Sequence, residues 1–278
     1  MSHATITVAA IQLSSQADVE GNLTQCGHWV EQAARARAEL VVLPENFAYF
    51  GPDAERARVA EPLSSAADPG PGPIQHALSG WARRHRLTVV GGGMPIQSSD
   101  PDRPYNTCVV FGPDGQLVAH YHKMHLFDVQ LTDGTKLEES RKTMPGEATA
   151  TALVQDFRVG LSICYDVRFP ELYRRLVDAG AEVLIVPAAF TLHTGKDHWT
   201  PLLRARAIES QCWVVAAAQW GLHPGGRRCF GHSMIVDPWG AVVAQSPDRT
   251  GIALATIDRD YLEQVRRSVP SLAHRRLR

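Results

Sequence analysis

The sequence lacks the features that mark several classes of protein. Its 278 residues include only five cysteines and no CxxC pair, so neither a disulfide framework nor a paired-cysteine metal site is indicated. No apolar run reaches the roughly 18 residues of a membrane-spanning helix, and no basic leader precedes the first apolar segment. The net charge of -1 offers no basic footprint for nucleic acid. We therefore expect a cytoplasmic protein with free thiols, with neither a membrane nor a nucleic acid as its partner.

What the sequence does contain is ordinary for a globular enzyme-sized chain. Hydrophobic residues make up 44% and charged residues 21%, and no flexible linker divides the chain, so we expect a single domain over residues 1–278. Apolar runs of strand length alternate with amphipathic stretches of helix length. The expected strands are 5–13, 39–44, 87–93, two within 106–123, 158–164, 182–187, 212–219, a hairpin over 231–246, and 251–258; the expected helices are 18–38, 74–86, 170–179 and 198–210.

The two halves of the chain resemble each other. "AELVVLPENF" (38–47) aligns with "AEVLIVPAAF" (181–190), and "VVFGPDGQLVA" (109–119) aligns with "MIVDPWGAVVA" (234–244). The continuous Val, Leu and Ile runs predict strands that are covered on both faces. A layer of helices covers one face of each sheet, and the sheet of the other half covers the second face. The sequence therefore predicts an α/β fold with an internal pseudo-repeat, arranged as a four-layer α-β-β-α sandwich.

The repeat also provides an internal comparison for Glu45. The equivalent position in the second half is Ala188, so the strand-end architecture does not require a carboxylate there. The alternative is that Glu45 only caps the loop after Pro44. We interpret Glu45 as a chemical rather than an architectural residue.

Two further reactive side chains stand at expected strand ends, Lys123 and Cys164. In sheets of this kind, sites collect in the loops beyond the strand ends. Cys164 is followed by Phe169 and Pro170, which are typical of a helix start. A base, a cation or a helix N-terminus beside a thiol activates it as a nucleophile. Taken singly, the cysteine could be an inert core residue and the lysine a surface residue, so the hypothesis depends on their coming together.

Other polar residues receive simpler interpretations. We expect Asp166, Arg168 and Glu171 to form a structural network beneath the cysteine. His120, His122 and His125 lack zinc-ligand spacing, and the glycine run 91–93 lacks dinucleotide-binding spacing. A Cys-His hydrolase of another fold remains an alternative, although no histidine has a position that demands that role. Apolar stripes at 172–177 and 261–265 fit either a symmetric contact between subunits or core packing.

Three segments together resemble the nitrilase superfamily of carbon-nitrogen hydrolases. They are "LPENF" around Glu45, "YHKMHLFDV" around Lys123 and "ICYDVRFPE" around Cys164. The resemblance extends over nearly the whole chain and implies a catalytic Glu45-Lys123-Cys164 triad. "ESRKTMPG" matches the family's second active-site glutamate at Glu139, where the following serine decides against the adjacent Glu138.

The resemblance also implies a reaction. Glu45 deprotonates Cys164, which attacks an amide carbonyl to give a thioester that water then hydrolyses. Lys123 and the backbone N–H of Tyr165 hold the oxyanion, following the rule that the residue after a nucleophile does so. The resemblance implies neither a metal nor an organic cofactor. It does imply a homodimer or a higher homo-oligomer.

Longer segments favour one branch of the superfamily, amidases that act on deaminated glutathione. These segments are "DHWTPLLRARAIESQCWVVAAAQ" and "GHSMIVDPWG". Omega-amidases acting on 2-oxo acid amides are the nearest alternative, followed by a nitrilase proper or a carbamoylase. A non-enzymatic interaction module is the alternative outside the enzymes, and retention of all three triad residues counts against it. The loop residues Lys136, Arg141 and Lys142 have two alternative interpretations. They either contact a carboxylated substrate or are solvated surface charges.

Overall fold

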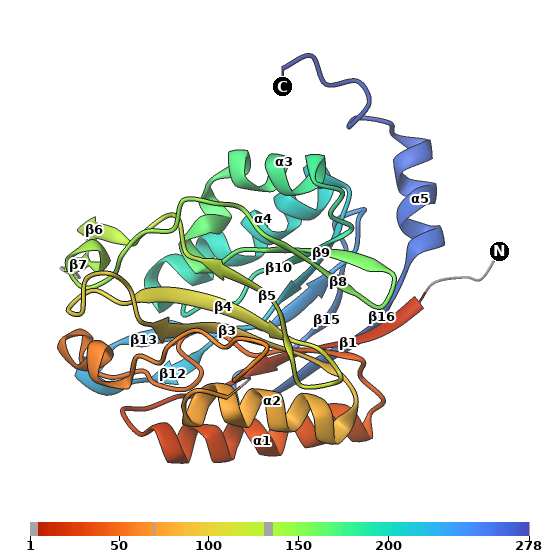
Figure 1. The fold of residues 1–278 in the computed structure, drawn as a ribbon. Coiled ribbons are helices and arrows are strands. Elements are labelled where there is room, and N and C mark those ends of the chain that lie inside the picture. The colour runs from red at the N-terminus through yellow and green to blue at the C-terminus, as the bar shows by residue number, and fades with distance from the viewer. Residues whose placement is uncertain (1–4, 69, 131–135, 278) are drawn as a thin grey trace.

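The computed structural model describes residues 5–68, 70–130 and 136–277. Figure 1 shows four layers: α1 and α2 cover one sheet, and α3 and α4 lie on the far side of the other sheet. The first sheet has the strand order β16-β1-β2-β3-β4-β5, and the second has the order β15-β14-β11-β10-β9-β8. The arrangement is the predicted α-β-β-α sandwich. No helix in the described ranges is both long and apolar enough to cross a bilayer.

The bounds of the elements are as follows. The first sheet contains β1 (Thr5–Gln12), β2 (Leu40–Val42), β3 (Thr88–Ile96), β4 (Tyr105–Phe111), β5 (Leu117–His122) and β16 (Gly251–Asp258). The second contains β8 (Thr151–Val154), β9 (Phe157–Leu161), β10 (Val183–Ile185), β11 (Trp213–Ala216), β14 (Met234–Val236) and β15 (Val242–Gln245). Two small ribbons are β6 (Asp128–Gln130) with β7 (Lys136–Glu138), and β12 (Trp220–Leu222) with β13 (Arg228–Phe230). The α-helices are α1 (Val19–Arg35), α2 (Pro73–His85), α3 (Pro170–Asp178), α4 (Leu192–Ser210) and α5 (Arg259–Ser268), and the 3-10 helices are η1 (Asp53–Val59), η2 (Glu139–Arg141), η3 (Cys164–Arg168) and η4 (Pro224–Gly226).

The sequence repeat corresponds to a repeat in topology. β2 pairs in parallel with β1 and β3, and its counterpart β10 pairs in parallel with β9 and β11. The two aligned hairpins are β4-β5 and β14-β15, each antiparallel and at the equivalent place in its sheet. The repeat is interlocked at its ends, because β16 is the last strand in sequence yet pairs along the full length of β1 in the first sheet.

The central strands bury both faces, as their continuous apolar runs predict. Val8 and Leu40 belong to the core that includes the space between the sheets, whereas Ala9 and Val41 belong to a second core beneath α1 and α2. Successive side chains of a strand point to opposite faces, so such a strand must be apolar at every position. The C-terminal ends of the strands β2, β5 and β9 therefore lie at the edge of a rigid, close-packed body.

Two expectations about helices need refinement. α4 begins at Leu192, not at His198, because Thr191 acts as its N-cap and accepts a hydrogen bond from Thr194 N–H at 3.4 Å. The stripes at 172–177 and 261–265 serve core packing, since Leu172, Leu262 and their neighbours on the same helix faces are buried within the chain itself.

One fully buried carboxylate connects the ends of β5 and β9. Asp166 Oδ2 accepts hydrogen bonds from Tyr121 OH and Ile163 N–H, both at 2.8 Å. Its Oδ1 accepts from His125 N–H at 3.2 Å and lies 2.7 Å from His125 Nδ1. The structural network predicted beneath the cysteine therefore exists at Asp166. Arg168 is not part of it, since its guanidinium instead lies 5.1 Å from the ring centre of Phe190.

We expect Asp166→Asn to lower the free energy of unfolding by about 2 kcal/mol, because a carboxylate oxygen that accepts buried donors becomes an N–H donor facing them. Urea denaturation would measure this as a lower midpoint at an unchanged slope. Asp197→Asn, on an exposed position of α4, is the matched control and should stay within about 0.5 kcal/mol of the unsubstituted protein. Equal stabilities of the two variants would contradict this interpretation of Asp166.

Candidate active site

Cys164 is held in an uncommon backbone conformation at the edge of the second sheet. β9 ends at Leu161, and Cys164 has a φ of 48°, in the left-handed region that non-glycine residues rarely adopt. Its N–H donates to Pro187 O at 2.8 Å, which fixes the turn against the end of β10. The predicted helix begins at Pro170 as expected, as α3, and η3 occupies Cys164–Arg168 between it and β9. Strain held by surrounding structure is common where a side chain must be presented for chemistry.

Glu45 follows β2 and has both carboxylate oxygens engaged. Oε1 accepts from Lys123 Nζ at 2.9 Å and from Asn106 Nδ2 at 2.8 Å. Oε2 accepts from Ala189 N–H at 2.9 Å. The same carboxylate lies at the cavity that Cys164 also lines. With the residue only 4% exposed, this carboxylate is fixed by several donors rather than by solvent.

Lys123 follows β5 and lies between two carboxylates. Besides Glu45, its Nζ contacts Glu139 Oε2 at 2.8 Å and Oε1 at 3.1 Å. Glu139 opens η2, and its Oε2 also accepts from Phe127 N–H at 2.7 Å. The adjacent Glu138 contacts Lys136 and Arg141 instead. The structure thus brings Glu45, Lys123, Cys164 and Glu139 together, and it is Glu139 rather than Glu138 that reaches the lysine.

The charges of this cluster set its protonation states. Burial favours a neutral Glu45, but the charge of Lys123 and hydrogen bonds from Lys123 and Ala189 outweigh it, so the pKa of Glu45 lies below its ordinary value of 4.5. Burial disfavours a charged Lys123, yet the Glu139 and Glu45 charges hold the pKa of Lys123 above its ordinary value of 10.5. Burial and the Glu45 charge raise the pKa of Cys164 well above 9.0.

The resting pair is therefore a thiol beside a carboxylate. The sequence-based expectation that Lys123 favours a thiolate is right in direction, but burial and the Glu45 charge exceed the effect of Lys123. A neutral thiol beside an ionised carboxylate is the arrangement that a general base requires. A histidine is not needed for this step, and His125 is already engaged with Asp166.

Asn106 belongs to the cluster and escaped the sequence-based reasoning. It is 1% exposed, and its Nδ2 donates to Glu45 Oε1 and, at 3.3 Å, to Glu139 Oε1. Its backbone O accepts from Lys123 N–H at 2.8 Å, since β4 and β5 are paired at this point. An asparagine at the start of an otherwise apolar strand is the signal that could have identified it.

The glycine run of β3 makes room for this cluster. A Cβ on Gly93 would lie 2.9 Å from Asn106 Oδ1 and 3.1 Å from Glu45 Cγ, and one on Gly92 would lie 2.0 Å from Leu43 O. The run therefore permits close approach of the Glu45 loop and β3 rather than binding a dinucleotide.

The oxyanion candidate Tyr165 is the second residue of η3. Backbone N–H groups in the first turn of a helix have no acceptor within the helix, so they are available to a ligand. Its ring packs edge-on against Phe127 and Phe169, with ring centres 4.8 and 5.2 Å apart. Lys123 Nζ is the second candidate donor, although Glu45 and Glu139 already accept from it.

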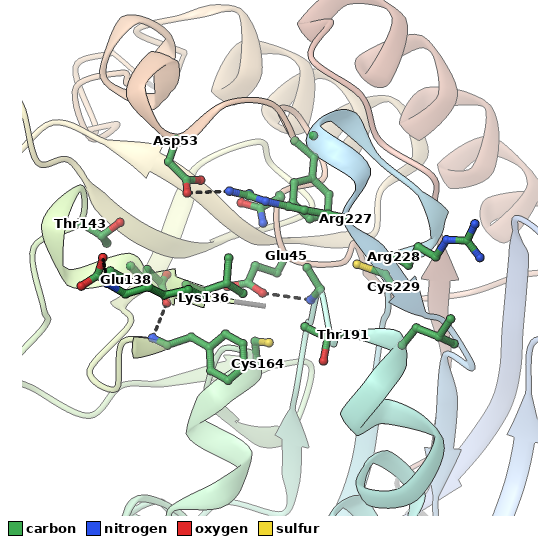
Figure 2. Close-up of a pocket in the computed structure, with 18 of the residues that line it drawn as sticks. Glu45, Asp53, Lys136, Glu138, Thr143, Cys164, Thr191, Arg227, Arg228 and Cys229 are labelled. Atoms are coloured by element: carbon green, nitrogen blue, oxygen red, sulfur yellow. Dashed lines mark hydrogen bonds and ion pairs between the residues drawn. The ribbon is translucent and has the colours of Figure 1, made fainter. Parts of the chain in front are cut away.

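Glu45, Lys123, Cys164 and Glu139 line one cavity of about 880 Å³. Figure 2 shows Glu45 and Cys164 facing the same space, with the ion pair of Asp53 and Arg227 on one side of it. Among the described residues that line the cavity, seven are lysine or arginine and four are aspartate or glutamate. The cavity is thus cationic on a chain of net charge -1, which favours an anionic ligand.

No group of three His, Cys, Asp or Glu side chains in the described ranges is arranged to hold a metal ion. Of the three histidines considered above, His122 Nδ1 contacts Thr107 Oγ1 at 2.8 Å and His125 Nδ1 contacts Asp166. Their partners are therefore protein groups that fix the strand and the turn.

Comparison with known proteins places this chain in a family. The profile of the carbon-nitrogen hydrolases matches residues 7–267. A protein of Synechocystis named deaminated glutathione amidase is 45% identical over 270 residues, which cover 96% of this chain and 97% of that protein.

Two crystal structures have the same fold. The NitFhit protein of C. elegans has a TM-score of 0.90 and 40% identity, covering 99% of this chain and 66% of that one. Nit3 of Saccharomyces cerevisiae, described as a member of the nitrilase superfamily, has a TM-score of 0.88 and 32% identity, covering 98% and 97%. With the profile match over nearly its whole length, the chain belongs to the carbon-nitrogen hydrolase family.

Proposed function

We propose that this carbon-nitrogen hydrolase is an amidase that cleaves deaminated glutathione, with Cys164 as nucleophile. The observation that carries the proposal is a buried thiol beside a carboxylate held ionised by Lys123, at the wall of a cationic cavity. The name of the Synechocystis relative supports this substrate. Deaminated glutathione is of tripeptide size and carries two carboxylates, and a cavity of about 880 Å³ is within the usual range for such ligands.

Acylation begins with proton transfer. The Cys164 sulfur attacks the amide carbonyl carbon while its proton passes to Glu45 Oε. Lys123 Nζ and Tyr165 N–H donate to the oxygen on which negative charge develops. Collapse of the tetrahedral intermediate breaks the C–N bond, and Glu45 returns the proton to the departing nitrogen. The products of this half-reaction are a thioester on Cys164 and a free amine.

Deacylation uses the same base. Glu45 takes a proton from water, and the resulting hydroxide attacks the thioester carbonyl. The C–S bond breaks, the carboxylic acid product leaves, and the proton on Glu45 returns to sulfur. Glu139 acts through Lys123 and the backbone of Phe127 as a positioning residue. All of these steps use protein groups and water, so we propose no cofactor.

We expect Cys164→Ala to lower kcat/KM for deaminated glutathione by at least about 10⁴-fold, because it removes the atom that forms the intermediate. Release of the cysteinylglycine amine measures the reaction. Cys229→Ala, another buried cysteine lining the cavity, is the control and should stay within about threefold of the unsubstituted enzyme. Near-normal turnover by folded Cys164→Ala enzyme would refute the mechanism. If the unsubstituted enzyme hydrolyses 2-oxo acid amides but not deaminated glutathione, the result would favour an omega-amidase.

The protonation states predict a characteristic pH dependence. Because the pKa of Cys164 is raised, the rate at which iodoacetamide alkylates this residue should rise with pH with a midpoint above pH 9.0. The alkylation of the Cys164→Ala protein is subtracted to isolate the signal of Cys164. Glu45→Gln removes a negative charge that raises the thiol pKa, so its midpoint should move to lower pH. On the acid side of the pH profile, kcat/KM should decrease only below pH 4.5, because Glu45 becomes protonated there. A thiol midpoint below pH 7 in the unsubstituted enzyme would show a resting thiolate and contradict this account.

We also propose a cytosolic homodimer. The five cysteines are unpaired, which is typical of a reducing compartment. Ile208 on α4 is 49% exposed, and Trp239, in the neighbouring turn, is 59% exposed. The turn packs on α4 through a hydrogen bond from Arg204 Nε to Gly240 O at 2.7 Å, so the two apolar side chains lie on one surface. Such a patch suits a two-fold symmetric contact.

We expect the double substitution of Ile208 and Trp239 by Glu to convert the dimer to a monomer in sedimentation velocity, because buried like charges would face each other across the two-fold axis. Leu222 is another apolar residue, 58% exposed, and the control substitution Leu222→Glu should leave the dimer intact. A monomeric unsubstituted protein at micromolar concentration would disprove the dimer, and a dimeric double variant would disprove this surface.

A further inference from the structure

Arg56 is a buried cation close to the reactive groups. It belongs to η1, a short 3-10 helix at the surface, and is the one buried residue of its seven. Arg56 is 8% exposed, whereas its neighbours Glu55 and Arg58 face solvent. The side chain instead lines the cavity that holds Glu45 and Cys164. An arginine is almost never buried unless it is paired, so its partner needs to be identified.

The protein satisfies only one edge of the Arg56 guanidinium. Nη1 donates to Asn46 Oδ1 at 2.6 Å. Nε and Nη2 are buried and have no hydrogen-bond partner among the described residues. These two nitrogens share the opposite edge of the planar group and their N–H bonds are parallel, which is the fork that a carboxylate accepts in a bidentate pair.

The acidic residues nearest in sequence are engaged elsewhere. Asp53 Oδ2 accepts from Arg227 Nη2 at 2.6 Å, and Glu55 Oε2 accepts from Tyr49 OH at 3.2 Å. The described part of the chain therefore provides Arg56 with a neutral amide oxygen as its hydrogen-bond partner and no carboxylate. Leaving a charged donor pair in this state is costly, and a ligand that completes the pair recovers that cost.

Asn46 fixes Arg56 relative to the reactive groups. It directly follows Glu45, has a left-handed φ of 59°, and donates its N–H to Gly93 O at 2.9 Å. The amide that orients the guanidinium therefore belongs to the same turn as the Glu45 carboxylate, which lines the cavity together with Cys164. A ligand group held on the free edge of Arg56 would be positioned with respect to the nucleophile.

We propose that Arg56 is a specificity-determining residue that binds a carboxylate of the substrate through Nε and Nη2. The inference deepens the proposed function and rests on it, because the substrate proposed there carries one carboxylate on its acyl part and another on its leaving group. Binding of either one sets the distance at which the scissile amide meets Cys164. The competing interpretation is that Arg56 only pins η1 to Asn46, in which case its effect would not depend on the charge of the substrate.

The test measures selectivity for substrate charge. Deaminated glutathione is compared with two analogues, one methyl-esterified on the acyl-side carboxylate and one on the leaving-group carboxylate. We expect the unsubstituted enzyme to prefer the free acid over one of these esters by about 100-fold in kcat/KM, mainly through KM. Arg56→Gln should abolish that preference. Arg56→Lys should retain only part of it, because the lysine ammonium lacks the paired N–H groups of the guanidinium. The ester that is discriminated identifies which carboxylate Arg56 binds.

Arg58→Gln, at an exposed position of the same helix, is the matched control and should retain the full preference. The inference is overturned if Arg56→Gln lowers kcat/KM by the same factor for all three substrates, or if it leaves the preference intact.

A binding experiment separates this inference from the proposed function. Deaminated glutathione is titrated calorimetrically into the Cys164→Ala protein and into the same protein carrying Arg56→Gln, where we expect Kd to rise by at least about 30-fold. If the unsubstituted enzyme fails to hydrolyse the compound but Arg56-dependent binding persists, the proposed substrate falls and the carboxylate site stands. If hydrolysis occurs and Kd is unchanged by Arg56→Gln, the carboxylate site falls alone.

Discussion

The site depends on one buried cation. Lys123 lies between Glu45 and Glu139, and without its charge the two carboxylates would repel each other in a region that solvent hardly reaches. An ion pair of this kind is weak evidence for stability, because desolvation of the charges offsets much of their attraction. Its consequence is chemical. The lysine keeps Glu45 ionised beside a neutral thiol, and that difference in protonation is the starting point of the proposed reaction.

The two packed sheets explain how distant residues meet with such accuracy. Glu45 and Lys123 stand at strand ends of the first sheet, and Cys164 stands at a strand end of the second. Asp166 joins the turns that carry Lys123 and Cys164, while Ala189 N–H, beside the repeat counterpart of Glu45, reaches back to the Glu45 carboxylate. The second half of the pseudo-repeat thus has alanine at position 188, where the first half has the acid, and contributes a backbone donor next to it.

Much of this arrangement follows from the sequence, because it is encoded in local patterns. Uninterrupted apolar strands and the repeated hairpins predicted the four layers, and the contrast of Glu45 with Ala188 indicated a chemical role. Asn106 and Arg56 could not be predicted in the same way. Asn106 owes its significance to contacts with Glu45 and Glu139, which are distant in sequence. Arg56 owes its significance to its burial at the cavity, and an arginine in a polar stretch such as "DAERARV" is typical of a solvated charge. The inserted η3 also lacks a periodic signal, since a single 3-10 turn is too short for one.

In the proposed reaction, buried Glu45 is the ionised base and Cys164 the neutral nucleophile. A ¹³C NMR titration of glutamate-labelled protein, with the Glu45 signal assigned from Glu45→Gln, measures this directly. The account predicts that the Glu45 carboxyl stays ionised down to pH 4.5 and becomes protonated only below it. A Glu45 signal that is protonated at pH 7 would mean that the acid and the thiol have exchanged roles, and would contradict the account.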